Sequence, residues 1–289
     1  MLEIINVVLP VFLIIAVGFF VGKKTKVNVQ PVVDLIIYIA GPALIFSSMS
    51  TADVAMDDFL RIILSAAGVI ALLVAVTFIY LKLSKDKRKG IYLPIATGNT
   101  GYLGFPVALF AFGMAGLSQA IIFDIVNGLF LFSFGIYIVH KKKELKEMFR
   151  TPLLYAVIIG LLFNIFSIKT PEVLFKPIEM IGMITIPAAL LVLGYRLTEI
   201  RIKSLKAAVS VSLFRIVGGF LSALLIVTVF SISGLARQVI LVQASMPSAV
   251  FTMILCQKYH RDAALVASVV FISTIISLVT LPLVLWFVL

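Results

Sequence analysis

Two short polar segments carry side chains that could bind a small anion, and each interrupts a run of apolar residues. In the first, Gly98–Pro106, three glycines and a proline surround Asn99 and Thr100. Glycine weakens a helix and proline removes a backbone donor, so the helix that the apolar flanks predict must break here. The second, Gln243–Ser248, has Pro247 among uncharged donors. Broken backbone inside a membrane survives only where protein or a wet cavity receives it, so each break predicts a polar site at membrane depth. The alternative is a kink that serves packing alone.

The donors at the two breaks suit a carboxylate. The N-terminal end of a helix carries partial positive charge and free N–H groups, which attract anions. If the two broken helices cross at their breaks, four helix ends meet there, as in many secondary transporters. Because the donors are uncharged, the anion could be held and still be released. The predicted substrate contacts are Asn99, Thr100, Tyr102, Asn127, Gln243, Ser245 and Ser248. The backbone of the crossover is assigned to Gly98, Gly101, Gly104, Pro106 and Pro247, with the first helix breaking at Pro106.

Four charged residues lie inside or near apolar runs. Asp124 has no basic residue near it in the sequence, and Asn127 follows on nearly the same helix face. An unpaired carboxylate in a membrane is costly, so Asp124 is a candidate for proton coupling, with a buried hydrogen bond as the alternative. Asp34 and Glu179 each follow a proline, which predicts acids in the first turn of a helix; ion or proton coupling is the other interpretation. We expect Arg215 to snorkel to the cytoplasmic surface, or to balance an acid or the substrate.

The composition indicates a membrane protein. Of 289 residues, 62% are hydrophobic and 13% are charged, whereas soluble domains are about half apolar and about a quarter charged. The net charge of +11 comes from short clusters between apolar runs, which indicates membrane topology and no nucleic-acid partner. A single cysteine excludes a cysteine-based metal cluster. The absence of His-Glu-x-x-His and Gly-x-Ser-x-Gly motifs argues against an enzyme. No cofactor is expected beyond a coupling proton or sodium ion.

Ten apolar runs are each about long enough to cross a bilayer core of roughly 30 Å. They cover residues 3–22, 30–49, 59–81, 91–112, 117–139, 151–168, 174–195, 206–230, 237–257 and 263–287. Lys and Arg gather in the odd-numbered connections, within Lys23–Lys26, Lys82–Lys89, Lys141–Arg150, Arg196–Lys206 and Lys258–Arg261, whereas Asp53, Asp57 and Asp58 lie in the second connection. The odd connections are therefore predicted to be cytoplasmic and both termini extracytoplasmic.

The two halves of the chain resemble each other. Prolines, glycines and acids recur in the same order and at matching offsets: Pro10 and Gly18 with Pro152 and Gly160, Asp34 and Pro42 with Glu179 and Pro187, and Pro106 with Pro247. Five spans per half is an odd number, so the second half must enter the membrane from the opposite side. The prediction is an all-α polytopic membrane protein of ten helices, built from two inverted repeats at residues 1–145 and 146–289, with helices 4 and 9 broken and crossing.

The segments around the breaks resemble a known family. Gly98-Asn99-Thr100 followed by Gly104–Leu109 is similar to the fourth-span crossover of the auxin efflux carrier family. Val242–Pro247, Lys258-Tyr259 and Leu281-Pro282 are similar to its last two spans. The resemblance implies a fold related to bile acid:sodium symporters, with a scaffold domain of helices 1, 2, 6 and 7 and a transport domain of helices 3–5 and 8–10. It also implies a homodimer through the scaffold domain and transport of organic anions, including dicarboxylates such as malonate.

One connection departs from the plant members of that family. They have a long hydrophilic loop between spans five and six, whereas His140–Arg150 is short and resembles the compact prokaryotic members. The function expected from the sequence is a secondary efflux carrier of a small carboxylate in the cell membrane. It would work by alternating access, with the substrate at the crossover of helices 4 and 9. The alternatives are a sodium-coupled uptake symporter of the bile-acid type, and a channel or sensor on the same fold.

Overall fold

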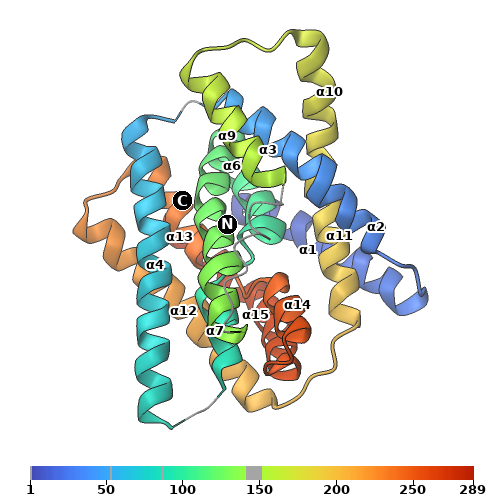
Figure 1. The fold of residues 1–289 in the computed structure, drawn as a ribbon, viewed down its shortest axis with the longest axis vertical. Helices are drawn as coiled ribbons and strands as arrows, with labels where there is room; N and C mark the ends of the chain where they lie inside the picture. The colour runs from blue at the N-terminus through green and yellow to red at the C-terminus, as the bar shows by residue number, and fades with distance from the viewer. Residues whose placement is uncertain (1, 53, 86–87, 141–151) are drawn as a thin grey trace.

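The computed structural model of the chain describes residues 2–52, 54–85, 88–140 and 152–289, which form helices joined by short connections (Figure 1). The α-helices are α1 (Leu2–Lys24), α2 (Gln30–Leu35), α3 (Gly41–Ser50), α4 (Met56–Leu83), α5 (Tyr92–Ala96), α6 (Phe105–Phe130), α7 (Ile136–His140), α9 (Pro152–Ile165), α10 (Glu172–Met183), α11 (Thr185–Thr198), α12 (Leu205–Val229), α13 (Gly234–Ala244), α14 (Val250–Lys258) and α15 (Ala263–Val288). The short π- and 3₁₀-helical segments are η1 (Ile36–Ala40), η2 (Lys89–Ile91), η3 (Thr100–Gly104) and η4 (Leu131–Gly135).

The prediction of an all-α membrane protein is confirmed for the described residues. Seven helical stretches among them are long and apolar enough to cross a membrane, and Thr100–Ile138 is counted as one of these. Asp53, Lys87, the basic cluster from Lys141 to Arg150 and the predicted boundary between the two halves all lie outside the described residues.

The chain reverses direction inside α6. Gly113 has a φ of 68° and a ψ of −161°, a conformation that only glycine adopts readily. The hydroxyl of Thr100 donates a hydrogen bond to the carboxylate of Asp124. In a straight helix these two residues would be about 36 Å apart, at about 1.5 Å per residue. Residues before and after Gly113 therefore run back along each other, which brings the polar segment of Gly98–Pro106 beside Asp124.

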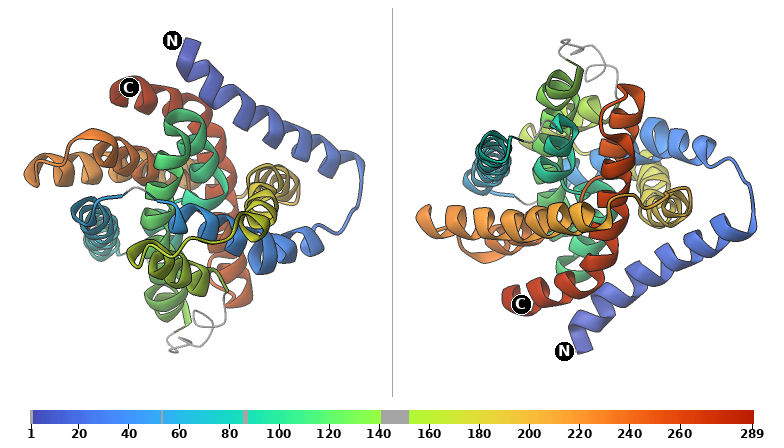
Figure 2. Two further views of the ribbon diagram at one scale, coloured as in Figure 1. Left: turned by 90° about the horizontal axis from the view of Figure 1, so that it is seen from above. Right: turned by 90° about the horizontal axis from the view of Figure 1, so that it is seen from below.

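The helices form two groups. α1 packs along α11, and α3 packs against α9 and α10. In Figure 2, α1 and α11 lie on one side of the molecule, and α4, α12 and α13 lie on the other, with α6 and α15 between them. The two ends of the chain lie near each other in Figures 1 and 2, where α1 contacts α15.

Two helices of the first group are interrupted at matching places. η1 separates α2 from α3, and Ile184 separates α10 from α11.

Glu179 lies in the interior of α10, because that helix begins at Glu172 and Pro177 lies inside it. The interpretation of Glu179 as a first-turn acid was therefore wrong. The same interpretation was wrong for Asp34, which lies beyond the first turn of the short α2 and accepts a hydrogen bond of 2.9 Å from the side-chain amide nitrogen of Gln30.

Candidate functional site

Two breaks in helical structure are joined by backbone hydrogen bonds. α5 ends at Ala96 and helical structure resumes at Thr100, while α13 ends at Ala244 and α14 begins at Val250. Between them, Gly98 and Ser248 form an isolated antiparallel bridge. The N–H of Asn99 donates to the carbonyl of Pro247 at 2.7 Å, and the N–H of Ala249 donates to the carbonyl of Thr97 at 3.2 Å. Each break therefore supplies hydrogen-bond partners for backbone groups of the other.

The first break lies earlier than the sequence predicted. Thr97 is extended, with φ −114° and ψ 124°, whereas Pro106 lies in the first turn of α6. A proline is tolerated there because the first N–H groups of a helix have no partner within the helix. The prediction that the helix breaks at Pro106 was thus wrong in position. In the second break Pro247 lies within the interruption, as predicted.

Side chains satisfy further carbonyls of the first break. The hydroxyl of Ser248 donates to the carbonyl of Pro94 at 2.7 Å. The amide nitrogen of Asn127 donates to the carbonyl of Gly98 at 2.8 Å. Buried backbone groups need such partners, and in a membrane the interior supplies no water to replace them. The break is therefore held in one conformation by residues from several helices.

Arg215 lies beside both breaks. Its side chain is 2% exposed, and it donates to the carbonyls of Ile95 at 3.0 Å, Ala244 at 3.1 Å and Met246 at 3.2 Å. The expectation that Arg215 snorkels to the surface was wrong. The free carbonyls at two helix ends accept hydrogen bonds from the guanidinium inside the protein. These bonds replace those that the side chain would make with water at the surface.

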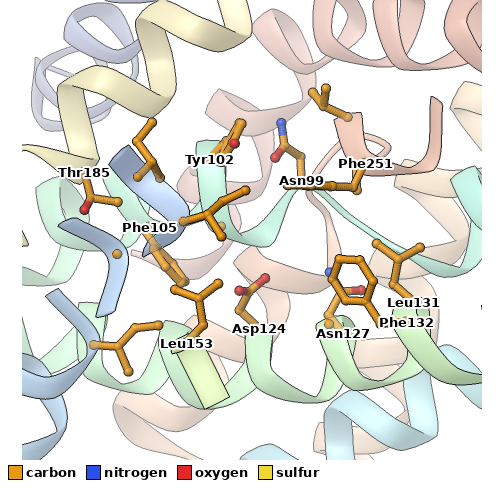
Figure 3. Close-up of a pocket in the computed structure, with 18 of the residues that line it drawn as sticks. Asn99, Tyr102, Phe105, Asp124, Asn127, Leu131, Phe132, Leu153, Thr185 and Phe251 are labelled. Atoms are coloured by element: carbon orange, nitrogen blue, oxygen red, sulfur yellow. The ribbon is translucent and has the colours of Figure 1, made fainter. Parts of the chain in front are cut away.

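A cavity of about 450 Å³ lies next to the breaks and between the two groups of helices. Its polar residues are Tyr38, Asn99, Tyr102, Asp124, Asn127 and Thr185. Figure 3 shows Asp124 and Asn127 on one helix, with Asn99 and Tyr102 on the opposite wall. Aliphatic and aromatic side chains cover most of the remaining surface, and the rings of Tyr102 and Phe251 meet edge to face at 6.0 Å between centroids. The cavity is mostly apolar with a few polar groups that converge, as small-molecule sites usually are.

Two polar atoms at this cavity are buried without a partner. They are the amide nitrogen of Asn99 and the hydroxyl oxygen of Thr185, on residues that are 5% and 7% exposed. Burying a hydrogen-bonding group without a partner costs roughly 1–3 kcal/mol. Both residues line the cavity, so each brings an unused hydrogen-bonding group next to it.

A second set of polar groups beside the cavity is paired, and its central residue, the predicted substrate contact Thr100, is fully buried and does not line the cavity. Thr100 donates to the carboxylate of Asp124 and accepts a hydrogen bond of 2.7 Å from the amide nitrogen of Asn127. A Cβ on Gly101 would lie 3.5 Å from the other carboxylate oxygen of Asp124, so this residue also lies beside the acid. Asp124 therefore has a hydrogen-bond donor within the protein and also lines the cavity.

Other residues predicted from the sequence do not reach the cavity. Ser245 and Ser248 are fully buried, and their hydroxyls donate to the carbonyls of Leu241 and Pro94. The amide of Gln243 is buried without a partner, next to Gly104. Asp34 and Glu179 are exposed and are not among the residues that line the cavity.

The sequence did not single out Thr185, Phe105 or Phe251, which also line the cavity. Thr185 begins α11, two residues before Pro187. The repeat pairs Pro187 with Pro42, so this interruption was detectable in principle. The place of Thr185 on the cavity wall depends on how α11 packs against the segment after the first break.

The comparisons agree with a transport function. Residues 3–147 and 136–285 match the family described as "Membrane transport protein". The chain is 31% identical to an uncharacterized transporter of Methanocaldococcus jannaschii, with 96% of each chain covered. It is 30% identical to an uncharacterized transporter of Methanothermobacter thermautotrophicus, with 96% of this chain and 95% of the relative covered. The chain therefore belongs to the membrane transport protein family, the auxin efflux carrier family that its two polar segments resemble.

Proposed function

We propose that the protein is a secondary active transporter that exports a small carboxylate across the cell membrane by alternating access. The substrate would bind in the cavity beside the two breaks. The observation that carries the proposal is the pair of buried, unpartnered polar atoms on Asn99 and Thr185, which line that one cavity from the two groups of helices.

An anion suits the helix ends that meet the cavity. α11 begins at Thr185 and α14 begins at Val250, and both residues line the cavity. The N-terminal end of a helix carries a partial positive charge, equivalent to about half an elementary charge. A carboxylate could accept hydrogen bonds from the Asn99 amide and the Thr185 hydroxyl while facing these ends. The cavity volume of about 450 Å³ suits a small organic anion.

Two sets of contacts support an inverted repeat. A Cβ on Gly18 would lie 2.2 Å from the carbonyl oxygen of Leu191, and a Cβ on Gly160 would lie 3.2 Å from that of Phe46. Gly18 and Gly160 are matched positions in the two halves, and the offset that pairs Pro42 with Pro187 also pairs Phe46 with Leu191. The two halves therefore make the same close contact.

The breaks give the second set of contacts. The N–H of Asn99 bonds to Pro247, and the N–H of Ala249 bonds to Thr97, so the interrupted segments of the two halves contact each other directly, as crossing helices require. We infer ten passes in two inverted halves, with the broken helices crossing at this bridge.

Alternating access requires two bodies that move against each other. The scaffold domain would consist of α1, α2, α3, α9, α10 and α11, and the transport domain of α4, α5, α6, α12, α13, α14 and α15 with the two breaks. Thr185 belongs to the first group, whereas Asn99, Asp124 and Phe251 belong to the second, so relative motion would open the cavity to either side. The scaffold domain would also form the interface of a homodimer. The odd-numbered connections would face the cytoplasm, with both termini outside.

Transport by the purified protein in liposomes tests this function. Labelled malonate and acetate are supplied as a dicarboxylate and a monocarboxylate, with and without a pH gradient. We expect saturable flux and counterflow of at least one of them. Flux that rises linearly with concentration, without counterflow, would instead favour a channel.

The variant Asn99→Ala locates the site. It should lower affinity for the transported acid roughly tenfold or more, because a hydrogen bond to a charged group contributes about 1.5–3 kcal/mol. Gln119→Ala is the matched control, since Gln119 is also buried with an unpartnered amide oxygen but does not line the cavity. Equal flux in Asn99→Ala and the wild type would refute this site.

A further inference from the structure

Arg215 joins the two breaks through backbone carbonyls. Its Nε–H donates to Met246 at 3.2 Å, and one terminal nitrogen donates to Ala244 at 3.1 Å. The other terminal nitrogen donates to Ile95 at 3.0 Å and to Ala96 at 3.4 Å. All four acceptors are main-chain oxygens. They surround the guanidinium in the way that carbonyl oxygens surround a bound metal cation.

Three of the four carbonyls belong to helix C-terminal ends, and the fourth, that of Met246, lies in the second break just after α13. α5 ends at Ala96 and α13 ends at Ala244. The C-terminal end of a helix carries partial negative charge on its free carbonyls, so both ends favour a cation such as the guanidinium. In transporters with broken helices, C-terminal ends and unwound carbonyls are the groups that coordinate the coupling sodium ion or proton.

The backbone leaves room for this side chain. A Cβ on Gly98 would lie 2.5 Å from a terminal nitrogen of Arg215, and a Cβ on Gly219 would lie 2.1 Å from the carbonyl oxygen of Ala244. Gly98 also lines the cavity, so one residue separates the guanidinium from the proposed substrate position. The cation is therefore close enough to support an anion there without touching it.

We propose that Arg215 is a resident cation that occupies the position between the two broken helices, so that the protein needs no sodium ion there. Removing the guanidinium leaves carbonyls that converge on an empty space, and a small alkali cation can then enter it. Arg215 is thus a positioning residue for the breaks. The consequence for flux rests on the proposed transport function, whereas cation binding at this site does not.

Thermal unfolding of the purified protein tests the cation site without any substrate. Wild type, Arg215→Lys and Arg215→Met are compared in sodium, potassium and choline chloride at equal ionic strength, with Arg237→Met as control. Arg237 is a partly buried arginine near the start of α13 that lies over the ring of Phe287. Because a ligand that binds only the folded state raises apparent stability, a new cation site must appear as a saturable shift.

The wild type, Arg215→Lys and Arg237→Met should each melt at the same temperature in all three salts. Arg215→Met should melt lower in choline, and sodium or potassium should raise its melting temperature saturably. A wild type that is specifically stabilised by sodium would overturn the proposal, and so would an Arg215→Met variant that folds equally well in every salt.

Gly98→Ala provides a second variant if Arg215→Met does not fold in any salt. Its added Cβ would displace the guanidinium, so we expect alkali cations to stabilise this variant over choline; an equal melting temperature in all salts would overturn the proposal.

Transport by the same variants in liposomes provides the last test. The wild type should transport its carboxylate equally in sodium and choline buffers. Arg215→Met flux should fall at least tenfold in choline and recover in part with an alkali cation. Sodium-dependent flux in the wild type would contradict the resident cation while leaving the transport function intact. A lack of any carboxylate flux would contradict only the proposed function, because the thermal unfolding measurements test the cation site independently.

Discussion

The N–H of Asn99 donates a hydrogen bond of 2.7 Å to the carbonyl of Pro247, which lies 148 positions later in the chain. This bond uses the backbone of Asn99, and its side-chain nitrogen remains without a partner at the cavity. One residue therefore joins the two breaks through its backbone and places an unused side-chain donor next to the cavity. Substitutions of the Asn99 side chain leave the backbone bond to Pro247 in place, so they test the binding role of the side chain alone.

The hydroxyl of Thr185 should contribute to substrate binding and little to stability. Thr185→Val keeps the shape and removes an oxygen that has no partner in the protein. We expect KM for the transported acid to rise roughly tenfold, as for the loss of one hydrogen bond to a charged group, with an unchanged melting temperature. Thr280→Val is the matched control, because the Thr280 hydroxyl is also buried without a partner but does not line the cavity. Equal KM values in Thr185→Val and Thr280→Val would contradict the prediction.

Asp124 should determine how transport depends on pH. The wild-type carboxylate gains or loses a proton at a position that lines the cavity and accepts a hydrogen bond from Thr100. Asp124→Asn keeps an acceptor oxygen but cannot titrate, so we expect its flux to vary much less with pH than that of the wild type. Asp34→Asn and Glu179→Gln are the controls, because both acids are exposed and do not line the cavity. If the pH profile of Asp124→Asn overlays the wild type, Asp124 has a structural role only.

The sequence predicted those features that depend on residues close to one another in the chain. Glycines and prolines interrupt long apolar runs, and this pattern predicted the polar segments around Asn99 and Pro247. The same pattern placed the first break too late, at Pro106, because proline in the first turn of a helix looks the same in sequence as proline that breaks one. The actual break at Thr97 depends on bonds to Ala249 and to neighbouring side chains.

The orientation of side chains at the breaks could not be predicted. Gln243, Ser245 and Ser248 have suitable chemistry, yet none of them lines the cavity. Helical periodicity does not extend through irregular backbone, so the phase after a break is set by tertiary contacts. The partners of Arg215 were unpredictable for the same reason, since they come from two helix ends that are distant in sequence.

The packing of α1 on α11 should be intolerant of any side chain at Gly194. A Cβ there would lie 2.0 Å from the carbonyl oxygen of Ile15. Gly194→Ala must therefore push the two helices apart, which costs about 1–3 kcal/mol when a packed interior is overfilled. Gly128→Ala is the control, because a Cβ at Gly128 would meet nothing within 4 Å. Thermal unfolding should show a lower melting temperature for Gly194→Ala and no loss for Gly128→Ala.

The two break prolines should differ in their effect on transport. Pro106 lies in the first turn of α6, where its missing N–H has little consequence, so Pro106→Ala should keep most of the flux. Pro247 lies inside the second break, and its carbonyl accepts the N–H of Asn99. Pro247→Ala removes the ring that restricts the backbone and adds a donor, which favours helix over the open break by up to roughly 3 kcal/mol on the soluble-helix scale. A more helical segment would withdraw the carbonyl from Asn99.

We therefore expect Pro247→Ala to lose flux while keeping the wild-type melting temperature. The double variant should transport no worse than Pro247→Ala, because the bridge to Asn99 is already lost. Liposome flux and thermal unfolding of the three variants check this order. A larger loss of flux in Pro106→Ala than in Pro247→Ala would show that the first turn of α6, and not the bridge between Asn99 and Pro247, determines the geometry of the site.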